Sequence, residues 1–163
     1  MYIIMPSNNV SGADNQQERL GTAYWISGFT DGEGCFSVAI IKNSTTRFGK
    51  QIFPEFVVTQ SMKSLPALRK IKDYFGCGGI FINKRYDNHN EYLYRYCVRS
   101  VAELHQKIIP FFERFPLRTY KYEDFKIFKK VVEMMANKEH LQKKGWNKIL
   151  SLLSTMNRKK KRS

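Results

Sequence analysis

The sequence predicts a single α+β domain in which helices cover one face of a small antiparallel sheet. Three observations predict this fold class. The chain of 163 residues is long enough for one domain with a substantial core. Two pairs of segments alternate between apolar and polar residues, as β-hairpins do. Segments with helical spacing of apolar residues precede, separate and follow these pairs, an arrangement that leaves one sheet face bare.

The first half of the predicted domain is a helix followed by a hairpin. Residues 1–21 are polar, resemble neither a signal peptide nor a transit peptide, and are expected to be a flexible lead-in. Thr22 is suited to cap a helix over residues 23–30. Strands are predicted over 35–42 and 51–60, because apolar and polar residues alternate there. The polar stretch "NSTTRFGK" between them predicts a long hairpin tip.

A second helix and a second hairpin follow. The helix is expected to open at Ser64, with Pro66 in its first turn and an apolar stripe that ends at Phe75. The glycine-rich "GCGG" ends this helix. Strands are predicted over 80–85 and 92–99, around the polar stretch "YDNHNE".

The last third of the chain is predicted to be helical. Ser100 and Glu103 form a capping box for the first of these helices, and Pro116 ends it. A longer helix with one apolar face comes next, and two shorter helical pieces are expected to meet at Gly145. We therefore expect a lead-in at 1–21, one domain at 22–157 and a basic tail at 158–163.

The charge of the chain points to an anionic partner. Lys and Arg number 28 against 14 Asp and Glu, which gives a net charge of +14. From Arg114 to Ser163 there are 15 basic and 4 acidic residues, so most of the excess lies in the last third. This balance favours nucleic acid or a membrane surface as the partner. No apolar run approaches the ~20 residues of a membrane span, so we expect no membrane partner.

The cysteines favour a reducing compartment. Three widely spaced cysteines without a Cys-x-x-Cys pair argue against a zinc site and against a disulfide framework. We therefore expect an intracellular protein, either of a prokaryotic cytoplasm or of an organelle such as a mitochondrion or chloroplast.

The stretch "TDGEG" places Asp31 and Glu33 between glycines, where the first helix gives way to a strand. As isolated letters it is a turn signal with solvated carboxylates. A calcium loop would need more carboxylates and a following helix. Gly28 and Gly32 lie four residues apart on one helical face, although glycine costs a helix about 1 kcal/mol relative to alanine. This spacing suggests the close approach of another helix, with a carboxylate at the foot of the contact.

The segment "WISGFTDGEG", Trp25 to Gly34, resembles the signature of the LAGLIDADG homing endonuclease family. The segments "FGCGGI", "YCVRSVAEL", "PLRTYKYEDF" and "NKEHLQKKGWNKILSLLSTMN" also resemble the family, in order, over most of the chain. The resemblance implies an αββαββα core with a saddle-like, four-stranded antiparallel sheet that has helices on one face and DNA on the other. It also implies a site-specific double-strand DNA endonuclease.

In this family, two such helices pack together and their feet present acids to the scissile phosphates. Glu33 matches the metal-binding acid, the Gly32 backbone carbonyl matches a second ligand, and Asp31 matches a more structural position. The implied cofactor is Mg²⁺, with other divalent metals such as Mn²⁺ as alternatives, since Mg²⁺ suits few carboxylates with phosphate oxygens and water. One motif implies a homodimer on a palindromic or near-palindromic site, with Ser27, Gly28, Asp31 and Gly32 at its interface.

Two further positions match the catalytic neighbourhood of the family. Gln60 matches a polar residue near the active site, although a strand-end polar group explains it equally well. Lys121 matches a lysine that assists the attacking water or stabilises transition-state charge. The family often shows two adjacent lysines where this chain has Tyr120 and Lys121, so Arg118 is an alternative for this role.

The polar row of the hairpins, together with the first hairpin tip, is expected to read bases. Arginine favours guanine edges, Gln and Asn favour adenine, and Glu accepts from cytosine. Each residue alone is explained by solvation, but as a row they indicate DNA contact. The candidates are Ser37, Asn43, Arg47, Lys50, Gln51, Glu55, Lys84 and Arg95.

Other classes of function stay open from the sequence. An RNA-binding intron maturase or a non-cleaving DNA-binding protein could use the same scaffold, whereas a basic chromatin protein explains the motif poorly. Glu33 favours the enzyme, because a protein that only binds has no need of an acid beside phosphate.

Overall fold

The computed structural model describes residues 12–83 and 92–156, in which helices pack on one sheet. Residues 101–114 form one continuous helical stretch with a π-helical middle at 104–108. In chain order the elements are α1 (Gly12–Glu33), β1 (Gly34–Lys42), β2 (Lys50–Ser61), η1 (Met62–Ser64), α2 (Leu65–Phe75), β3 (Gly79–Asn83), β4 (Leu93–Val98), α3 (Val101–Glu103), η2 (Leu104–Ile108), α4 (Ile109–Arg114), α5 (Lys121–Ala136), η3 (Glu139–Leu141) and α6 (Lys143–Thr155).

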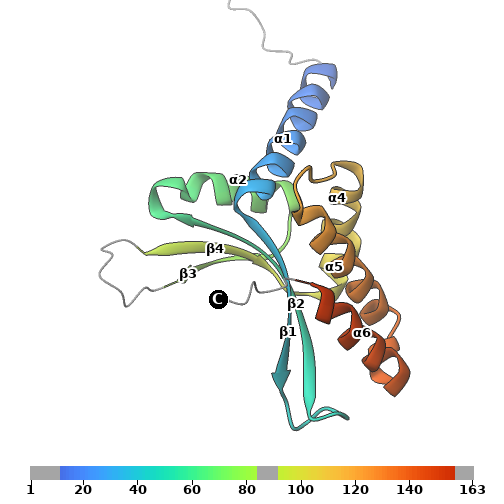
Figure 1. Ribbon diagram of the computed structural model, residues 1–163. Coiled ribbons are helices and arrows are strands. Elements are labelled where there is room, and N and C mark those ends of the chain that lie inside the picture. The colour runs from blue at the N-terminus through green and yellow to red at the C-terminus, as the bar shows by residue number, and fades with distance from the viewer. Residues whose placement is uncertain (1–11, 84–91, 157–163) are drawn as a thin grey trace, which may run out of the picture.

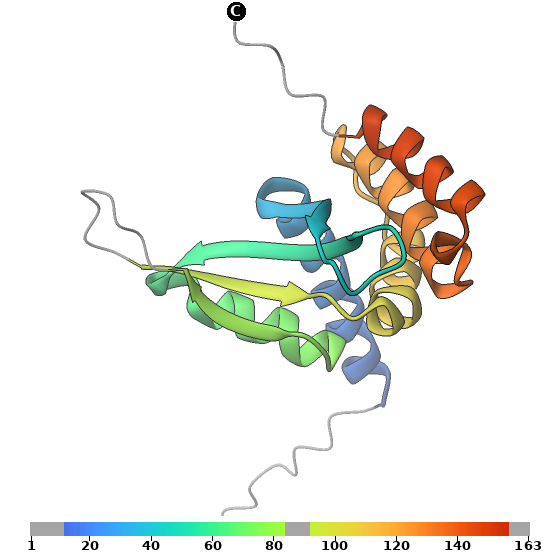
Figure 2. The ribbon, with the colours of Figure 1, turned by 90° about the horizontal axis from the view of Figure 1, so that it is seen from below.

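The four strands form one antiparallel sheet in the order β1-β2-β4-β3 (Figure 1). The α2 helix packs on β2, β3 and β4, whereas α5 packs on β1 and β2. Seen from below, α1 and α2 lie behind the strands (Figure 2). The predicted α+β fold, with helices on one face of a four-stranded sheet, is therefore confirmed.

Alternation along the strands divides the sheet into two rows of side chains. The helix-covered row includes Phe36 of β1, which is buried. Its ring centroid lies 5.1 Å from that of Phe56 and 5.2 Å from those of Phe112, Phe125 and Phe128. These rings come from β1, β2, α4 and α5, so one aromatic cluster ties the sheet to the C-terminal helices. The opposite row forms the open face of the sheet.

The first helix is longer than the sequence predicts. It begins at Gly12, so residues 12–21, which we expected to be a flexible lead-in, form its exposed first turns. This stretch contains Gln, Glu, Arg and Leu, which are good helix formers, and Thr22 therefore lies inside the helix instead of capping it. The rest of the expected lead-in lies outside the described residues.

The junction of the last helices also differs from the prediction. The connection between α5 and α6 falls at residues 137–142, where Lys138 adopts a φ of 61°. Gly145, where we expected two helical pieces to meet, lies inside α6. An added Cβ at Gly145 would lie 2.1 Å from the carbonyl oxygen of Glu139, so this glycine permits close packing of η3 on α6.

The capping of α3 agrees with the prediction, because the Ser100 hydroxyl accepts a hydrogen bond from the Glu103 backbone N–H at 3.4 Å. Within residues 12–83 and 92–156, no helix combines the length and the apolar character needed to cross a membrane.

Candidate active site

The C-terminal end of α1, Gly32 and Glu33, lies at the edge of the sheet, where the helix passes directly into β1. We call this end the foot of α1. Glu33 is the last residue of α1 and Gly34 is the first of β1. An added Cβ at Gly34 would lie 2.5 Å from Thr30 Cγ2, so the sharp passage from helix to strand requires glycine. Gly32 and Glu33 are both exposed at this foot. The sequence motif thus places one solvent-accessible carboxylate where the helix ends and the sheet begins.

Asp31, two residues earlier, faces the body of the protein. Its Oδ2 accepts from the Arg118 N–H at 2.6 Å, and its Oδ1 accepts from the hydroxyl of Thr119 at 2.6 Å and the N–H of Thr119 at 3.2 Å. Burial alone would raise the pKa of Asp31, but these hydrogen bonds hold it below its usual value. Asp31 therefore ties α1 to the segment that leads into α5.

The Lys121 side chain caps the C-terminal end of α1. The last carbonyls of a helix lack partners within the helix, and Lys121 Nζ donates to those of Thr30 and Asp31, each at 2.8 Å. Burial lowers the pKa of Lys121, although Asp31, Cys35 and Glu33 act in the opposite direction. The ammonium group thus lies beside the exposed foot.

Arg118 is less suited than Lys121 to act at the foot. Its backbone N–H donates to Asp31, and its exposed side chain lines a small hollow of about 130 Å³ beside Tyr24, Gly28 and Phe115. Of the two basic candidates, Lys121 is the one whose charged group contacts α1 at its foot.

The donors at the foot fit a hard divalent cation in part. The Glu33 carboxylate and the Gly32 carbonyl are oxygen ligands of the kind that Mg²⁺ prefers, and the C-terminal end of a helix attracts positive charge. Among residues 12–83 and 92–156, no group of three or more His, Cys, Asp or Glu side chains is placed to hold a metal. One chain therefore offers only part of a coordination shell.

Gln60 lies near this end of the sheet but not on the open face. It is opposite Tyr94 in the register of β2 and β4, and it is half-buried. Alternation places it in the same row as Val58 and Tyr96, which are fully buried beneath the helices.

Some of the candidate DNA-contacting residues lie on the open face of the sheet and others do not. The open-face row holds Ser37 and Gln51, and Asn43 joins it because Asn43 Nδ2 donates to Gln51 Oε1 at 2.9 Å. Lys50, which we expected in the hairpin tip, is the exposed first residue of β2 and lies in the same row as Ile52, two residues along the strand. Lys84 lies outside the described residues.

Arg47 of the hairpin tip points toward the helices. Its Nη1 donates to the Leu141 carbonyl at 3.3 Å, and its guanidinium lies 5.7 Å from the Phe48 ring centroid. The Phe48 ring in turn packs on Trp146 of α6, with centroids 5.0 Å apart. Arg47 thus docks the tip on the C-terminal helices, and its base-reading role stays a prediction.

Glu55 and Arg95 both lie on the open face but contact each other. Arg95 Nη2 lies 2.7 Å from Glu55 Oε1, and Arg99 Nε lies 2.5 Å from Glu55 Oε2. The base-reading roles of Glu55 and Arg95 stay predictions, and the ion pair shows that the two side chains hold each other on that face. Arg99 was not among the candidates, although its alternation with Arg95 along the chain was the signal for it.

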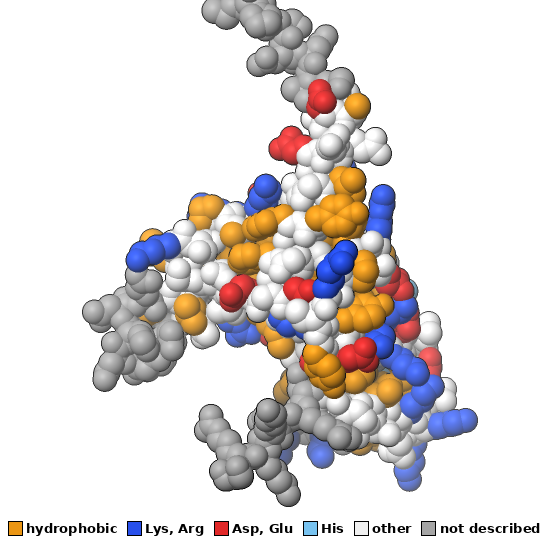
Figure 3. Space-filling view, turned by 45° about the horizontal axis from the view of Figure 1, so that its top comes forward, with side chains coloured by type: hydrophobic (Ala, Val, Ile, Leu, Met, Phe, Trp, Pro, Cys, Tyr) orange, Lys and Arg blue, Asp and Glu red, His pale blue; other side chains and the backbone are white. Residues whose placement is uncertain are grey.

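One side of α1 is open in the described chain. An added Cβ at Gly28 or Gly32 would meet nothing within 4 Å. Beside these glycines, Tyr24 is 60% exposed and Trp25 is 37% exposed, and hydrophobic side chains gather along α1 in the space-filling view (Figure 3). Ser27 differs, because it is buried and its Oγ donates to the Phe115 carbonyl at 2.9 Å. Ser27 therefore bonds within the chain and ties α1 to the segment before α5.

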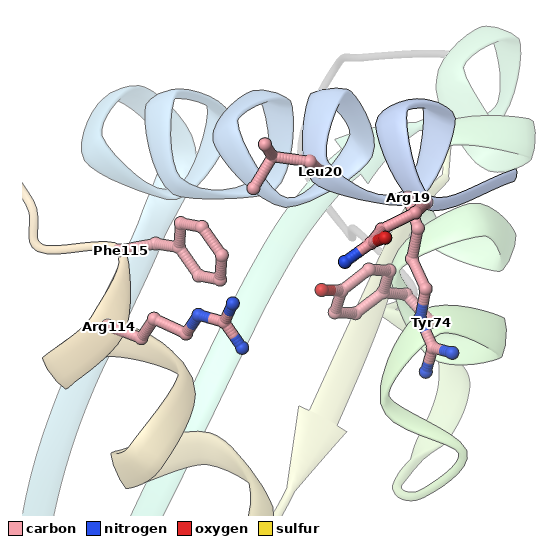
Figure 4. A pocket seen from close by; sticks show the side chains of 6 residues that line it. Arg19, Leu20, Tyr74, Arg114 and Phe115 are labelled. Carbon is pink, nitrogen blue, oxygen red and sulfur yellow. The ribbon is translucent and has the colours of Figure 1, made fainter. Parts of the chain in front are cut away.

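A separate pocket of about 410 Å³ lies between α1, α2 and α4 (Figure 4). The Cζ atom of Arg19 lies 6.0 Å from the centroid of the Tyr74 ring, and that of Arg114 lies 5.4 Å from the centroid of the Phe115 ring. Its lining contains arginines and aromatic rings but no carboxylate, so the metal-ligand candidates stay at the foot of α1. The lining residues are Gln16, Arg19, Leu20, Tyr74, Arg114 and Phe115.

Comparison with known proteins agrees with this geometry. The sequence model of the family described as LAGLIDADG endonuclease matches residues 26–132. A probable intron-encoded endonuclease of Neurospora crassa is 32% identical over 135 residues, which are 82% of this chain and 24% of that protein. The chain spans about a quarter of the length of the first curated relatives that it matches.

Two solved structures are similar in fold and sequence. The homing endonuclease I-TnaI is 38% identical with a TM-score of 0.73, over 85% of this chain and 89% of that chain. The I-SmaMI LAGLIDADG homing endonuclease bound to cleaved DNA is 36% identical with a TM-score of 0.76, over 86% of this chain and 45% of that chain.

Proposed function

Because the chain belongs to the LAGLIDADG endonuclease family, we propose that it is a site-specific double-strand DNA endonuclease that acts as a homodimer and requires a divalent metal, Mg²⁺ in the first place. The observation that carries this proposal is the foot of α1, where the exposed Glu33 carboxylate and the Lys121 ammonium lie together at the edge of an open sheet face. An acid and a cation at one place are suited to phosphodiester hydrolysis.

Several features support DNA as the substrate. The net charge of +14 favours a polyanion, and the open face carries Ser37, Gln51 and arginine side chains that are suited to base edges. The similar I-SmaMI structure is described as bound to cleaved DNA. Relatives of this kind, named as endonucleases, favour cleavage over the maturase and binding-only alternatives. A genomic target would place the protein inside a cell or organelle.

The residues at the foot are assigned distinct roles. Glu33 and the Gly32 carbonyl would hold the cation, which when bound neutralises phosphate charge and activates the attacking water. Lys121 neutralises charge that develops on the phosphate, and its bonds to α1 fix its position. Asp31 keeps the segment before α5 against α1, so that Lys121 is held beside the foot. Gln60 is proposed to act from the neighbouring strand end.

The single motif and the open side of α1 support a homodimer. Two copies related by a two-fold axis would bring two feet to the two strands of a palindromic or near-palindromic site. The open glycines at 28 and 32 leave room for a second α1 at close range. The structural alignments support one endonuclease domain in this chain. It covers 45% of the I-SmaMI chain and 89% of the I-TnaI chain.

The direct test is a plasmid assay on the target sequence, found by selection from a randomised library. We expect double-strand cleavage with Mg²⁺, weaker or altered cleavage with Mn²⁺, and binding without cleavage in EDTA or Ca²⁺. Binding without cleavage under every metal condition would instead identify a non-cleaving DNA-binding protein, and preference for RNA would identify a maturase.

A further inference from the structure

The centre of the open face holds three charged side chains that contact one another. Glu55 lies opposite Ser37 of β1, and its side chain is only 10% exposed. Its Oε1 accepts from Arg95 Nη2 at 2.7 Å, and its Oε2 accepts from Arg99 Nε at 2.5 Å. Each carboxylate oxygen thus already has a charged donor. Glu55 is therefore poorly placed to accept from a cytosine amino group, and its geometry suits the orientation of two guanidinium groups.

The two arginines use different edges of their guanidinium groups. A guanidinium carries five N–H donors, and the end-on contact with guanine O6 and N7 uses two parallel N–H bonds. Arg99 contacts Glu55 through Nε, so this contact uses neither of its terminal nitrogens. Arg95 contacts Glu55 through a terminal nitrogen, Nη2, so one of the two terminal nitrogens that a guanine edge would use already binds Glu55. With its side chain 43% exposed, Arg99 is the better prepared of the two for a guanine edge.

Two phenylalanine rings hold the plane of the Arg99 guanidinium. Its Cζ lies 5.6 Å from the ring centroid of Phe53 on β2 and 5.6 Å from that of Phe81 on β3. Both contacts are within the range of cation–π attraction. A planar group that is held by one carboxylate and two rings loses little conformational freedom when it binds a base.

We propose that Arg99 reads one guanine in each half of the DNA site and that Glu55 is its positioning residue. Ser37, opposite Glu55, is three residues from Gly34 at the foot of α1, a separation of about 10 Å along a strand. Glu55 therefore lies along the sheet from the metal-ligand candidates and not among them. This inference rests on the proposed DNA-binding function and assigns its base preference at one position.

The experiment is selection of bound sequences from duplex DNA with a randomised half-site, in Ca²⁺ so that cleavage is not required. We expect wild-type protein to select guanine at one position. Arg99→Ala should reduce that preference by about 5-fold to 150-fold and leave the other positions unchanged. Arg99→Lys keeps the charge but not the paired N–H groups, so it should lose the preference while the salt dependence of binding stays the same.

Glu55→Gln should weaken the preference at the same position, although Glu55 itself touches no base. The thermal midpoint of the Glu55→Gln variant shows whether its fold is intact. Lys126→Ala is the matched control, because it removes a positive charge from α5, where Lys126 pairs with Glu123. Its selected sequences should match those of the wild type.

Retention of the guanine preference in Arg99→Ala, or its loss in Arg95→Ala alone, would overturn the assignment to Arg99. A wild-type profile for Glu55→Gln would overturn the positioning role. Wild-type protein that selects no sequence at all would contradict the proposed function and, with it, this inference.

Discussion

At the scale of single residues, Asp31 and Glu33 lie two positions apart but face different surroundings. Asp31 accepts three hydrogen bonds from Arg118 and Thr119, whereas Glu33 is exposed at the end of α1. A half turn of helix thus separates a carboxylate that holds the structure together from one that is open to solvent. Substitutions at the two positions should therefore have different consequences.

Glu33→Gln should abolish cleavage without abolishing binding. The amide keeps the size of the side chain but removes the charge that would hold a cation, so we expect the cleavage rate to fall at least about 100-fold. Affinity should be kept or should increase slightly, because a negative charge near phosphate is removed. The measurement is the single-turnover rate in Mg²⁺ beside affinity in Ca²⁺ at fixed salt. A variant that cuts at the wild-type rate would contradict the metal role of Glu33.

Asp31→Asn should lower stability before it affects chemistry. Loss of a charged acceptor of three hydrogen bonds should cost about 1–3 kcal/mol at neutral pH. Because the pKa of folded Asp31 is lowered from 3.8, its contribution to stability is complete above that pH and is lost as pH falls through the folded pKa. Thermal midpoints of the two proteins should therefore differ at pH 7 and converge below about pH 3.8. A difference independent of pH would contradict this account.

At the scale of elements, α1 links the core, the foot and an open side. Ala23, Ile26 and Thr30 are fully buried on one side, whereas Gly28 and Gly32 lie where an added Cβ has no neighbour. A helix with an open glycine-lined side beside exposed aromatic residues is suited to pack closely against a second helix.

Gly28→Leu should separate two chains without unfolding one. In the single chain an added Cβ at this position meets nothing within 4 Å, and leucine raises helix propensity by about 1 kcal/mol, so the monomer should fold. In a dimer the leucine would enter the space of the partner helix. We expect light scattering at micromolar concentration to show a dimer for the wild type and a monomer for the variant. Ser151→Leu, on the exposed side of α6, is the control and should stay dimeric; a monomeric wild type would contradict the homodimer itself.

At the scale of the whole molecule, the excess positive charge is concentrated in the last third of the sequence. The helices there carry lysines that pair with acids, such as Lys129 with Glu113 and Glu133, and others for which no ion pair is seen among the described residues, such as Lys130 and Lys148. The final basic run, Arg158 to Arg162, lies outside the described residues, and its role is predicted from charge alone.

Deletion of residues 158–162 should weaken DNA binding equally for all sequences. Each phosphate contact that is lost should flatten the slope of log affinity against log salt by about 0.9, because fewer counterions are released. Affinity titrations over a range of salt, on the selected target and on an unrelated duplex, measure this directly. An unchanged slope together with a changed base preference would instead show that the tail reads sequence.

The order of elements, the two hairpins and the acid at a helix-to-strand passage follow from the sequence itself. Apolar periodicity and turn residues are local signals, and they predicted the α+β fold and the place of Glu33. Local signals also set the limits of the prediction. The first turns of α1 were missed because polar helix formers resemble a polar linker.

Tertiary structure alone decided which side chains meet. The hydroxyl of Thr119 reaches Asp31 across 88 residues of sequence, and the Lys121 ammonium reaches the Thr30 carbonyl across 91. Glu55 and Arg99, 44 residues apart, pair because the register of β2 and β4 brings them together. Such contacts depend on register and helix packing, which no local pattern encodes. For this reason the sequence predicted the residue types of the open face, whereas the fold decided which of them hold one another and which stay exposed.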